Sequence, residues 1–216
     1  MRKQRWGYQP LKTSTRARLV AALSVCTLAG CASAPQPEPQ TQEAEVEAVV
    51  PEAAMVNFED GVALMQGGED NRAQAIFEQL SAQYPQYSGP WTNLGILHAK
   101  AERPEQAEAA FGEALRINPQ SAAAWTELGI LYRQQGRFED ASEAYQQAIA
   151  ADPQYALAYR NYGILLDLYL AEPEAALAAY RSYQELDGQQ NEQTERWIVE
   201  VGRRVDAQQR TAQVSP

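Results

Sequence analysis

The chain has few of the side chains that catalytic and metal-binding sites need. Among its 216 residues are two cysteines, Cys26 and Cys31, and one histidine, His98. Structural zinc sites use clusters of Cys and His, and covalent catalysis needs a nucleophile beside a base. The composition therefore predicts that the protein is not an enzyme, binds no metal and needs no cofactor.

Positive charge is scarce beyond the start of the chain. The first 30 residues hold six Lys and Arg and no acid, whereas the rest has 12 Lys and Arg against 28 Asp and Glu. Because so acidic a chain repels the phosphate backbone, we expect no nucleic-acid partner.

Also missing is an apolar run long enough to cross a bilayer as a helix, which takes about 20 residues. The mostly apolar stretch at residues 19–29 is shorter, and it follows a basic segment. This order is typical of a secretory signal peptide. We therefore expect residues 1–30 to be a signal peptide.

The end of that stretch, Leu28-Ala29-Gly30-Cys31, resembles the bacterial lipobox. In such lipoproteins the cysteine is acylated and becomes the first residue of the mature chain. The resemblance implies a covalent lipid on Cys31, and three acyl chains would anchor the protein stably, since two already do so. A plain secretory signal and an uncleaved anchor remain the alternatives.

The two residues after Cys31 indicate which bacterial membrane would hold the lipid anchor. Ala32 and Ser33 stand where enteric lipoproteins of the inner membrane have an aspartate. The resemblance thus implies a lipid anchor in the outer membrane, with the protein on its periplasmic face. Residues 31–53 are rich in Pro, Gln and Glu and contain no cation or aromatic residue, so we expect a disordered tether.

A segment of eight residues recurs with a period of 34. Trp91-Thr-Asn-Leu-Gly-Ile-Leu-His98 is followed 34 residues later by Trp125-Thr-Glu-Leu-Gly-Ile-Leu-Tyr132, and a related segment begins at Tyr159. Downstream, alanines, an aromatic residue and a proline recur with the same period. Such a period is the sign of a repeat architecture.

These residues resemble the tetratricopeptide repeat, which pairs two helices. The resemblance implies an all-α tetratricopeptide repeat superhelix of about four repeats over residues 54–188, with bounds 54–87, 88–121, 122–155 and 156–188. The small residues would let the two helices approach closely, and Pro119 and Pro153 would end the second helix. The first and last repeats depart from the pattern, as terminal repeats do.

Residues 189–216 follow the last repeat. Trp197, Ile198, Val201 and Val205 are spaced by one, three and four residues, which places them on one face of a helix. We interpret this segment as a capping helix with a polar tail. A separate partner-binding helix is the alternative.

The resemblance also suggests where a partner would bind. The first helix of each repeat lines the concave side of the superhelix, and the residue after each signature glycine would face the groove. These residues form an apolar row: Val62, Ile96, Ile130 and Ile164. Candidate polar contacts around it are Asn93, Lys100, Arg133, Arg160 and Asn161. The cations favour a ligand with acidic groups beside apolar anchors; simple packing of the row between neighbouring helices is the alternative.

These features predict a membrane-anchored periplasmic scaffold that binds a protein or peptide in its concave groove and assists the assembly of envelope complexes. A lipobox followed by such repeats is similar to type IV pilus biogenesis lipoproteins of the pilotin kind and to tight-adherence pilus assembly lipoproteins. A scaffold for cell-wall enzymes is a further alternative. The pattern specifies neither the partner nor the oligomeric state.

Overall fold

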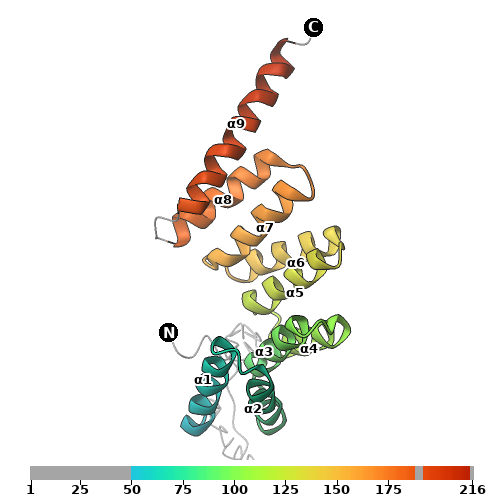
Figure 1. The fold of residues 1–216 in the computed structure, drawn as a ribbon, viewed down its shortest axis with the longest axis vertical. Helices are drawn as coiled ribbons and strands as arrows, with labels where there is room; N and C mark the ends of the chain where they lie inside the picture. Colours follow the sequence, from blue (N-terminus) through green and yellow to red (C-terminus); the bar gives the residue numbers. More distant parts are fainter. Residues whose placement is uncertain (1–49, 188–191, 215–216) are drawn as a thin grey trace, which may run out of the picture. The chain divides into compact units, whose positions relative to one another are not determined.

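The computed structural model describes residues 50–187 and 192–214. The predicted signal peptide, Cys31 and nearly all of the predicted tether lie outside these ranges. Within them, the regular elements are all α-helices (Figure 1). The helices are α1 (Glu52–Gln66), α2 (Asp70–Gln83), α3 (Ser88–Lys100), α4 (Pro104–Ile117), α5 (Ala122–Gln134), α6 (Phe138–Ala151), α7 (Ala156–Leu168), α8 (Pro173–Asp187) and α9 (Glu192–Val214).

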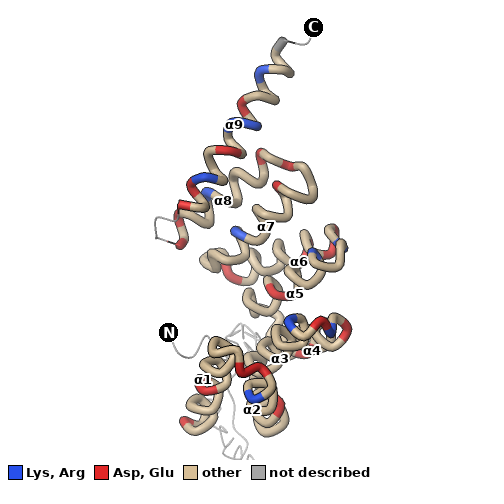
Figure 2. The backbone as a smooth tube through the Cα atoms, in the orientation of Figure 1, with Lys and Arg blue, Asp and Glu red and all other residues tan. Residues whose placement is uncertain are grey.

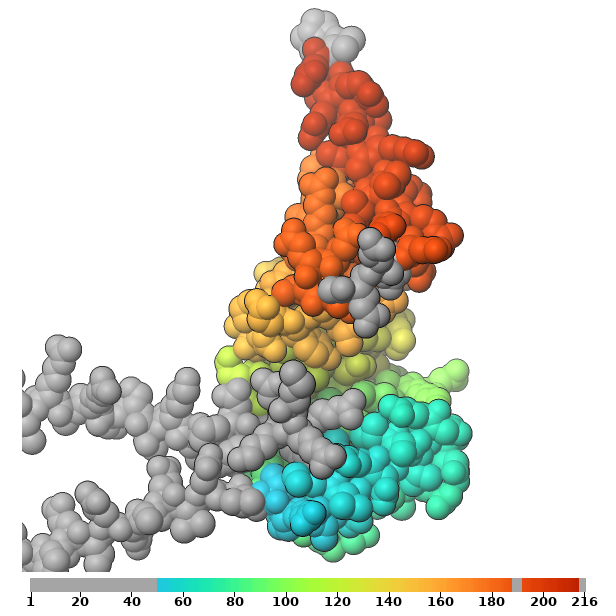
Figure 3. Space-filling view, turned by 90° about the vertical axis from the view of Figure 1, so that its left-hand side faces the viewer, coloured from blue at the N-terminus to red at the C-terminus, as the bar shows by residue number. Residues whose placement is uncertain are grey.

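The helices form four antiparallel pairs and one final helix. The first helix of each pair (α1, α3, α5, α7), called the A helix below, packs most extensively on the second, the B helix. Each B helix also contacts the first helix of the next unit, and α3 contacts α5 as α5 contacts α7. Successive pairs pack directly on one another (Figure 3). The predicted all-α arrangement of four repeats and a capping helix is confirmed.

A glycine in each A helix lies against an aromatic ring of its B helix. A Cβ built on Gly129 would come within 2.6 Å of Cε1 of Tyr145, far inside van der Waals contact. The same contact recurs in the other pairs: Gly61 with Phe77, Gly95 with Phe111 and Gly163 with Tyr180. These four rings are almost completely buried. The recurring glycine is therefore required by helix packing.

Differences between the first repeat and the others follow from its place at the end of the stack. Tyr162, in α7, packs on Tyr145 of the preceding B helix, with 6.2 Å between ring centroids. The corresponding residue of α3 is the buried Leu94, but that of α1 is the exposed Asp60. No described helix precedes α1, so a polar residue costs nothing there.

The last helix, α9, closes the other end of the stack. Val201 and Val205 are buried in one cluster with residues of α7 and α8, and Trp197 and Ile198 pack against that cluster. Arg204 forms an ion pair with Asp167 of α7. Beyond Val205 the described side chains of α9 are exposed. The predicted capping role is thus confirmed for the first half of α9.

We predict opposite effects from adding the same methyl group at two helical glycines. Gly95→Ala should lower the free energy of unfolding by about 1–3 kcal/mol, because the new Cβ would collide with the buried Phe111 ring. Gly112→Ala in α4 should raise it by about 0.5–1 kcal/mol, because no atom lies within 4 Å of its Cβ position. Urea unfolding measures both, and a change of the same sign at both sites would contradict the packing account.

Candidate protein-interaction face

Each A helix has one side that neighbouring helices cover only in part. In α5, Ala123, Glu127, Ile130 and Gln134 are half-buried or exposed and follow one another at spacings of four, three and four, which places them on one side of the helix. Most of the remaining positions of α5 are buried. The corresponding residues of the neighbouring A helices are Gly89, Asn93, Ile96 and Lys100 in α3 and Leu157, Asn161, Ile164 and Leu168 in α7. These twelve residues, of which Gly89 and Asn161 are buried, are called the A-helix face below.

The predicted apolar row is half-buried throughout. Ile96 packs against the core cluster of α4 and α5, Ile130 against the cluster of α6 and α7, and Ile164 against the cluster that includes α9. Val62 is half-buried as well. Each side chain is therefore partly covered by a neighbouring helix and partly accessible, so packing and partner contact do not exclude each other.

The final helix continues the row and shows what covers it. Val199 of α9 occupies the position equivalent to Ile164. It follows Ile164 by one residue more than the repeat period of 34, because the last repeat has an extra residue in its turn. No described helix follows α9, and Val199 is 52% exposed. Partial burial of the earlier row residues therefore comes from the next unit of the stack.

Helix α7 adds two apolar residues that the sequence argument missed. Leu157 is 44% exposed and Leu168 is 67% exposed. They precede Ile164 by seven residues and follow it by four, so all three lie on one side of α7. Applying this spacing to each A helix would have found them from the sequence.

The two asparagines that were predicted to contact a partner are hydrogen-bonded to the backbone of their own helices. Nδ2 of Asn93 donates to the carbonyl of Gly89 at 2.9 Å, and Nδ2 of Asn161 donates to the carbonyl of Leu157 at 2.8 Å. Asn161 is buried. Their donors therefore serve the helix backbone.

The three predicted cationic contacts also have partners inside the chain. Lys100 forms an ion pair with Asp70 of α2, with 2.7 Å between Nζ and Oδ2. Nε of Arg133 lies 3.5 Å from the hydroxyl of Tyr145, and Cζ of Arg160 lies 5.9 Å from the centroid of the Trp197 ring. These cations thus join neighbouring helices.

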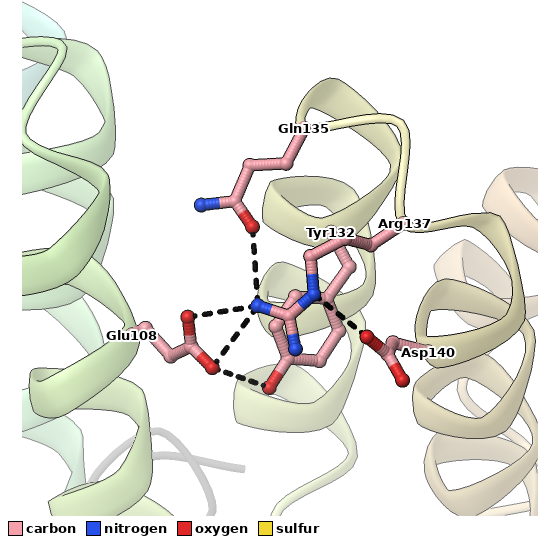
Figure 4. A network of polar contacts seen from close by, with 5 residues as sticks. All are labelled: Glu108, Tyr132, Gln135, Arg137 and Asp140. Atoms are coloured by element: carbon pink, nitrogen blue, oxygen red, sulfur yellow. Dashed lines mark hydrogen bonds and ion pairs between the residues drawn. The ribbon is translucent and has the colours of Figure 1, made fainter.

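A further polar network links the second and third repeats beside the turn between α5 and α6 (Figure 4). Arg137 contacts Glu108 of α4 at 3.1 Å and Asp140 of α6 at 2.6 Å, and its guanidinium lies over the Tyr132 ring. The hydroxyl of Tyr132 donates to Glu108 at 2.9 Å. One interface earlier, Arg103 donates to Gln74 at 3.0 Å. We interpret these contacts as structural, because they join repeats away from the A-helix face.

Charge on the three central A helices is sparse (Figure 2). Helices α3, α5 and α7 carry five Lys, Arg, Asp or Glu residues: Lys100, Glu127, Arg133, Arg160 and Asp167. Four of them have the partners given above. Glu127 is the exception, since it forms no hydrogen bond or ion pair with any residue that the structure describes.

Glu127 is half-buried at the centre of the A-helix face. Burial raises the pKa of its carboxyl from the usual 4.5 to about 6. Burial is also the main cause that raises the pKa of Tyr145 and Tyr155, and the nearby charge of Glu127 adds to it. Arg133 acts on Tyr145 as well, since its Nε lies 3.5 Å from the Tyr145 hydroxyl, but no described cation forms an ion pair with the Glu127 carboxylate.

We predict that Glu127→Gln stabilises the protein at neutral pH. A carboxyl whose pKa is higher in the folded state gives stability that is present below pH 4.5 and lost as the pH rises through 6. The free energy of unfolding should therefore increase by about 1–2 kcal/mol at pH 7.5, and the difference from the native chain should vanish near pH 4. Urea unfolding across this range measures it.

Glu143→Gln is the matched control, because Glu143 is exposed on α6. It removes the same charge at the protein surface, where we expect little change in the free energy of unfolding. A Glu127→Gln variant that is less stable than the native chain at pH 7.5 would contradict the environment described for Glu127.

Comparisons with known proteins agree with the fold. One tetratricopeptide repeat model matches residues 92–156 and again 126–191, and a second matches residues 61–87. Together these segments span more than half of the chain. No curated protein sequence matches the chain.

Several solved structures are similar. PilF of Pseudomonas aeruginosa superposes with a TM-score of 0.65 at 16% identity, over 72% of this chain and 70% of that one. A tetratricopeptide repeat protein of Thermus thermophilus gives 0.59 at 19%, over 68% and 80%. MamA gives 0.55 at 21%, over 69% and 81%. At such identities the likeness concerns the fold.

Two further properties concern the described residues only. None of their helices has both the length and the apolar composition needed to cross a membrane. Nor do they bring three or more His, Cys, Asp or Glu side chains together as a metal ion would require. The repeat period, the stacked helix pairs and the matching models lead to one conclusion: the chain belongs to the tetratricopeptide repeat family, a fold of protein-interaction scaffolds.

Proposed function

We propose that the protein is a non-enzymatic scaffold that holds a protein or peptide partner on its A-helix face. The observation that carries this proposal is the exposure of apolar side chains there. Leu157 and Leu168 are 44% and 67% exposed on the same face as the half-buried Ile130 and Ile164. Contiguous exposed apolar surface on a soluble domain is typical of an interaction site.

The stacked architecture suits this role. Each repeat contributes one short stretch of accessible surface, and neighbouring A helices place these stretches side by side, since α3 contacts α5 and α5 contacts α7. A partner segment crossing the A helices would therefore meet Ile96, Ile130 and Ile164 in turn. Repeat proteins use extended surfaces of this kind to bind partners.

We further propose that the scaffold is anchored by a lipid on Cys31 at the periplasmic face of the outer membrane. The support is in the sequence: a basic segment, a short apolar stretch and Leu28-Ala29-Gly30-Cys31 at its end. Residues 31–51 then serve as the tether that separates the membrane from α1. Because α1 begins at Glu52, the last two residues of the predicted tether, 52 and 53, belong to that helix.

Assembly of an envelope complex is the process that such a protein would serve. Pilus assembly is the first alternative, because the order of lipobox and repeats is similar to that of pilus biogenesis lipoproteins; the likeness to PilF adds the same fold at low identity. Organisation of cell-wall enzymes is the second alternative. Neighbouring genes separate the two, as secretin or pilin genes favour one and hydrolase or synthase genes the other.

We predict that a photoreactive amino acid on the A-helix face captures the partner in cells. Placed at Leu168, it should crosslink one predominant protein, because this side chain is the most exposed apolar residue of the face. The matched position is Gln147, which is exposed on α6. Mass spectrometry of the adducts identifies the partner, and equal adducts from both positions would contradict the proposal.

The same cells test the anchor. Adducts of the native chain should fractionate with the outer membrane, and Cys31→Ser should move the protein to the soluble fraction or leave it uncleaved. If Cys31→Ser changes neither fractionation nor mobility, the lipid anchor is wrong, while the crosslinking result for the A-helix face still holds.

A further inference from the structure

One charged residue of the A-helix face, Glu127, has no hydrogen bond or ion pair among the described residues, whereas the cations on or beside the face have partners. The Lys and Arg residues of α3, α5 and α7 are engaged with other side chains: Lys100 with Asp70, Arg133 with Tyr145 and Arg160 with Trp197. An acidic ligand would have to draw these cations away from their present contacts. A basic ligand group would find Glu127 available, since this carboxylate forms no hydrogen bond or ion pair with the described residues.

We propose that the A-helix face binds a segment that brings a Lys or Arg side chain onto Glu127, between apolar side chains that contact the isoleucine row. The inference rests on the proposed function and names the chemistry of the partner. It reverses the charge expected from the sequence, where the cations favoured an acidic ligand.

The position of Glu127 fits this role. It lies one helical turn before Ile130 on the same side of α5, so a basic side chain that reaches it has an apolar residue as neighbour. At the equivalent positions of α3 and α7 are Asn93 and Asn161, whose amides bond to their own helix backbones. Of these three equivalent positions, only that of Glu127 carries a charge, and it lies at the centre of the A-helix face.

The described groups around Glu127 form no ion pair with it, since Arg133, the one cation of α5, contacts the hydroxyl of Tyr145 instead. Tyr145 of α6 and Tyr155, the residue before α7, are near enough for the charge of Glu127 to contribute to their raised pKa, which burial mainly causes. Both are neutral at physiological pH, and burial raises the pKa of Glu127 itself to about 6. Proteins retain such unfavourable charges where function requires them, and a cation from the partner would supply the missing interaction.

A pH dependence follows. A cation that contacts Glu127 stabilises the ionised carboxylate, so the bound partner lowers the pKa of Glu127. Where the carboxyl of the free protein is protonated, formation of the complex therefore releases a proton. A peptide with a basic residue should therefore bind more weakly at pH 5 than at pH 7.5, and this loss should disappear when Glu127 is replaced by Gln.

The test uses the full chain, purified in detergent, and an array of random-sequence dodecapeptides as the probe. The native chain, Glu127→Gln, Glu127→Lys and the control Glu143→Gln are applied in parallel, with circular dichroism to establish that each is folded. The native chain and the control should select peptides with Lys or Arg between apolar residues. For the best of these peptides, Glu127→Gln should raise Kd about tenfold.

Charge reversal provides the decisive comparison. Glu127→Lys should select Asp or Glu at the position where the native chain selects Lys or Arg; if it does not fold, the selection by Glu127→Gln decides. Peptides that bind all variants alike, or a native chain that selects acidic residues, would overturn this inference and leave the scaffold proposal standing. A folded native chain that selects no peptide would overturn both.

Discussion

A glycine of each A helix lies directly against an aromatic ring of its B helix, and the rest of the stack depends on this contact. The ring fills one side of the A helix, the preceding B helix covers a second side, and the next A helix partly covers a third. One side remains. Because the contact recurs in every pair, the uncovered sides recur with it, and residues one repeat apart line up as a continuous face.

The two ends of the stack differ from its middle, because each lacks a described neighbouring helix on one side. Asp60 of α1 occupies a position that is apolar in α3, because no described helix lies before it. Val199 of α9 is more exposed than the isoleucines at the equivalent positions, because no described helix follows it. In α9, Ile198 takes the place of the repeated glycine, which is possible because no described helix follows α9 as its B helix.

Much of this fold could be predicted from the sequence, since the period alone locates the four helix pairs and the spacing of Val201 and Val205 indicates the capping helix. The apolar row was likewise visible at its repeat spacing. The partners of the cations were not, because Asp70, Tyr145 and Trp197 belong to other helices and meet Lys100, Arg133 and Arg160 only in the folded chain. Glu127 was missed for the same reason: its lack of a partner depends on what the neighbouring repeats place beside it.

The isoleucine methyl groups provide the most direct test of the central claim, that the chain binds its partner through the uncovered sides of the A helices. Ile96, Ile130 and Ile164 lie on the A-helix face, whereas Ile76, Ile117 and Ile149 lie on B helices and serve as internal controls. In a methyl-labelled chain titrated with the partner, the NMR signals of the first three should shift and those of the other three should stay in place. Shifts confined to Ile76, Ile117 and Ile149 would contradict the account.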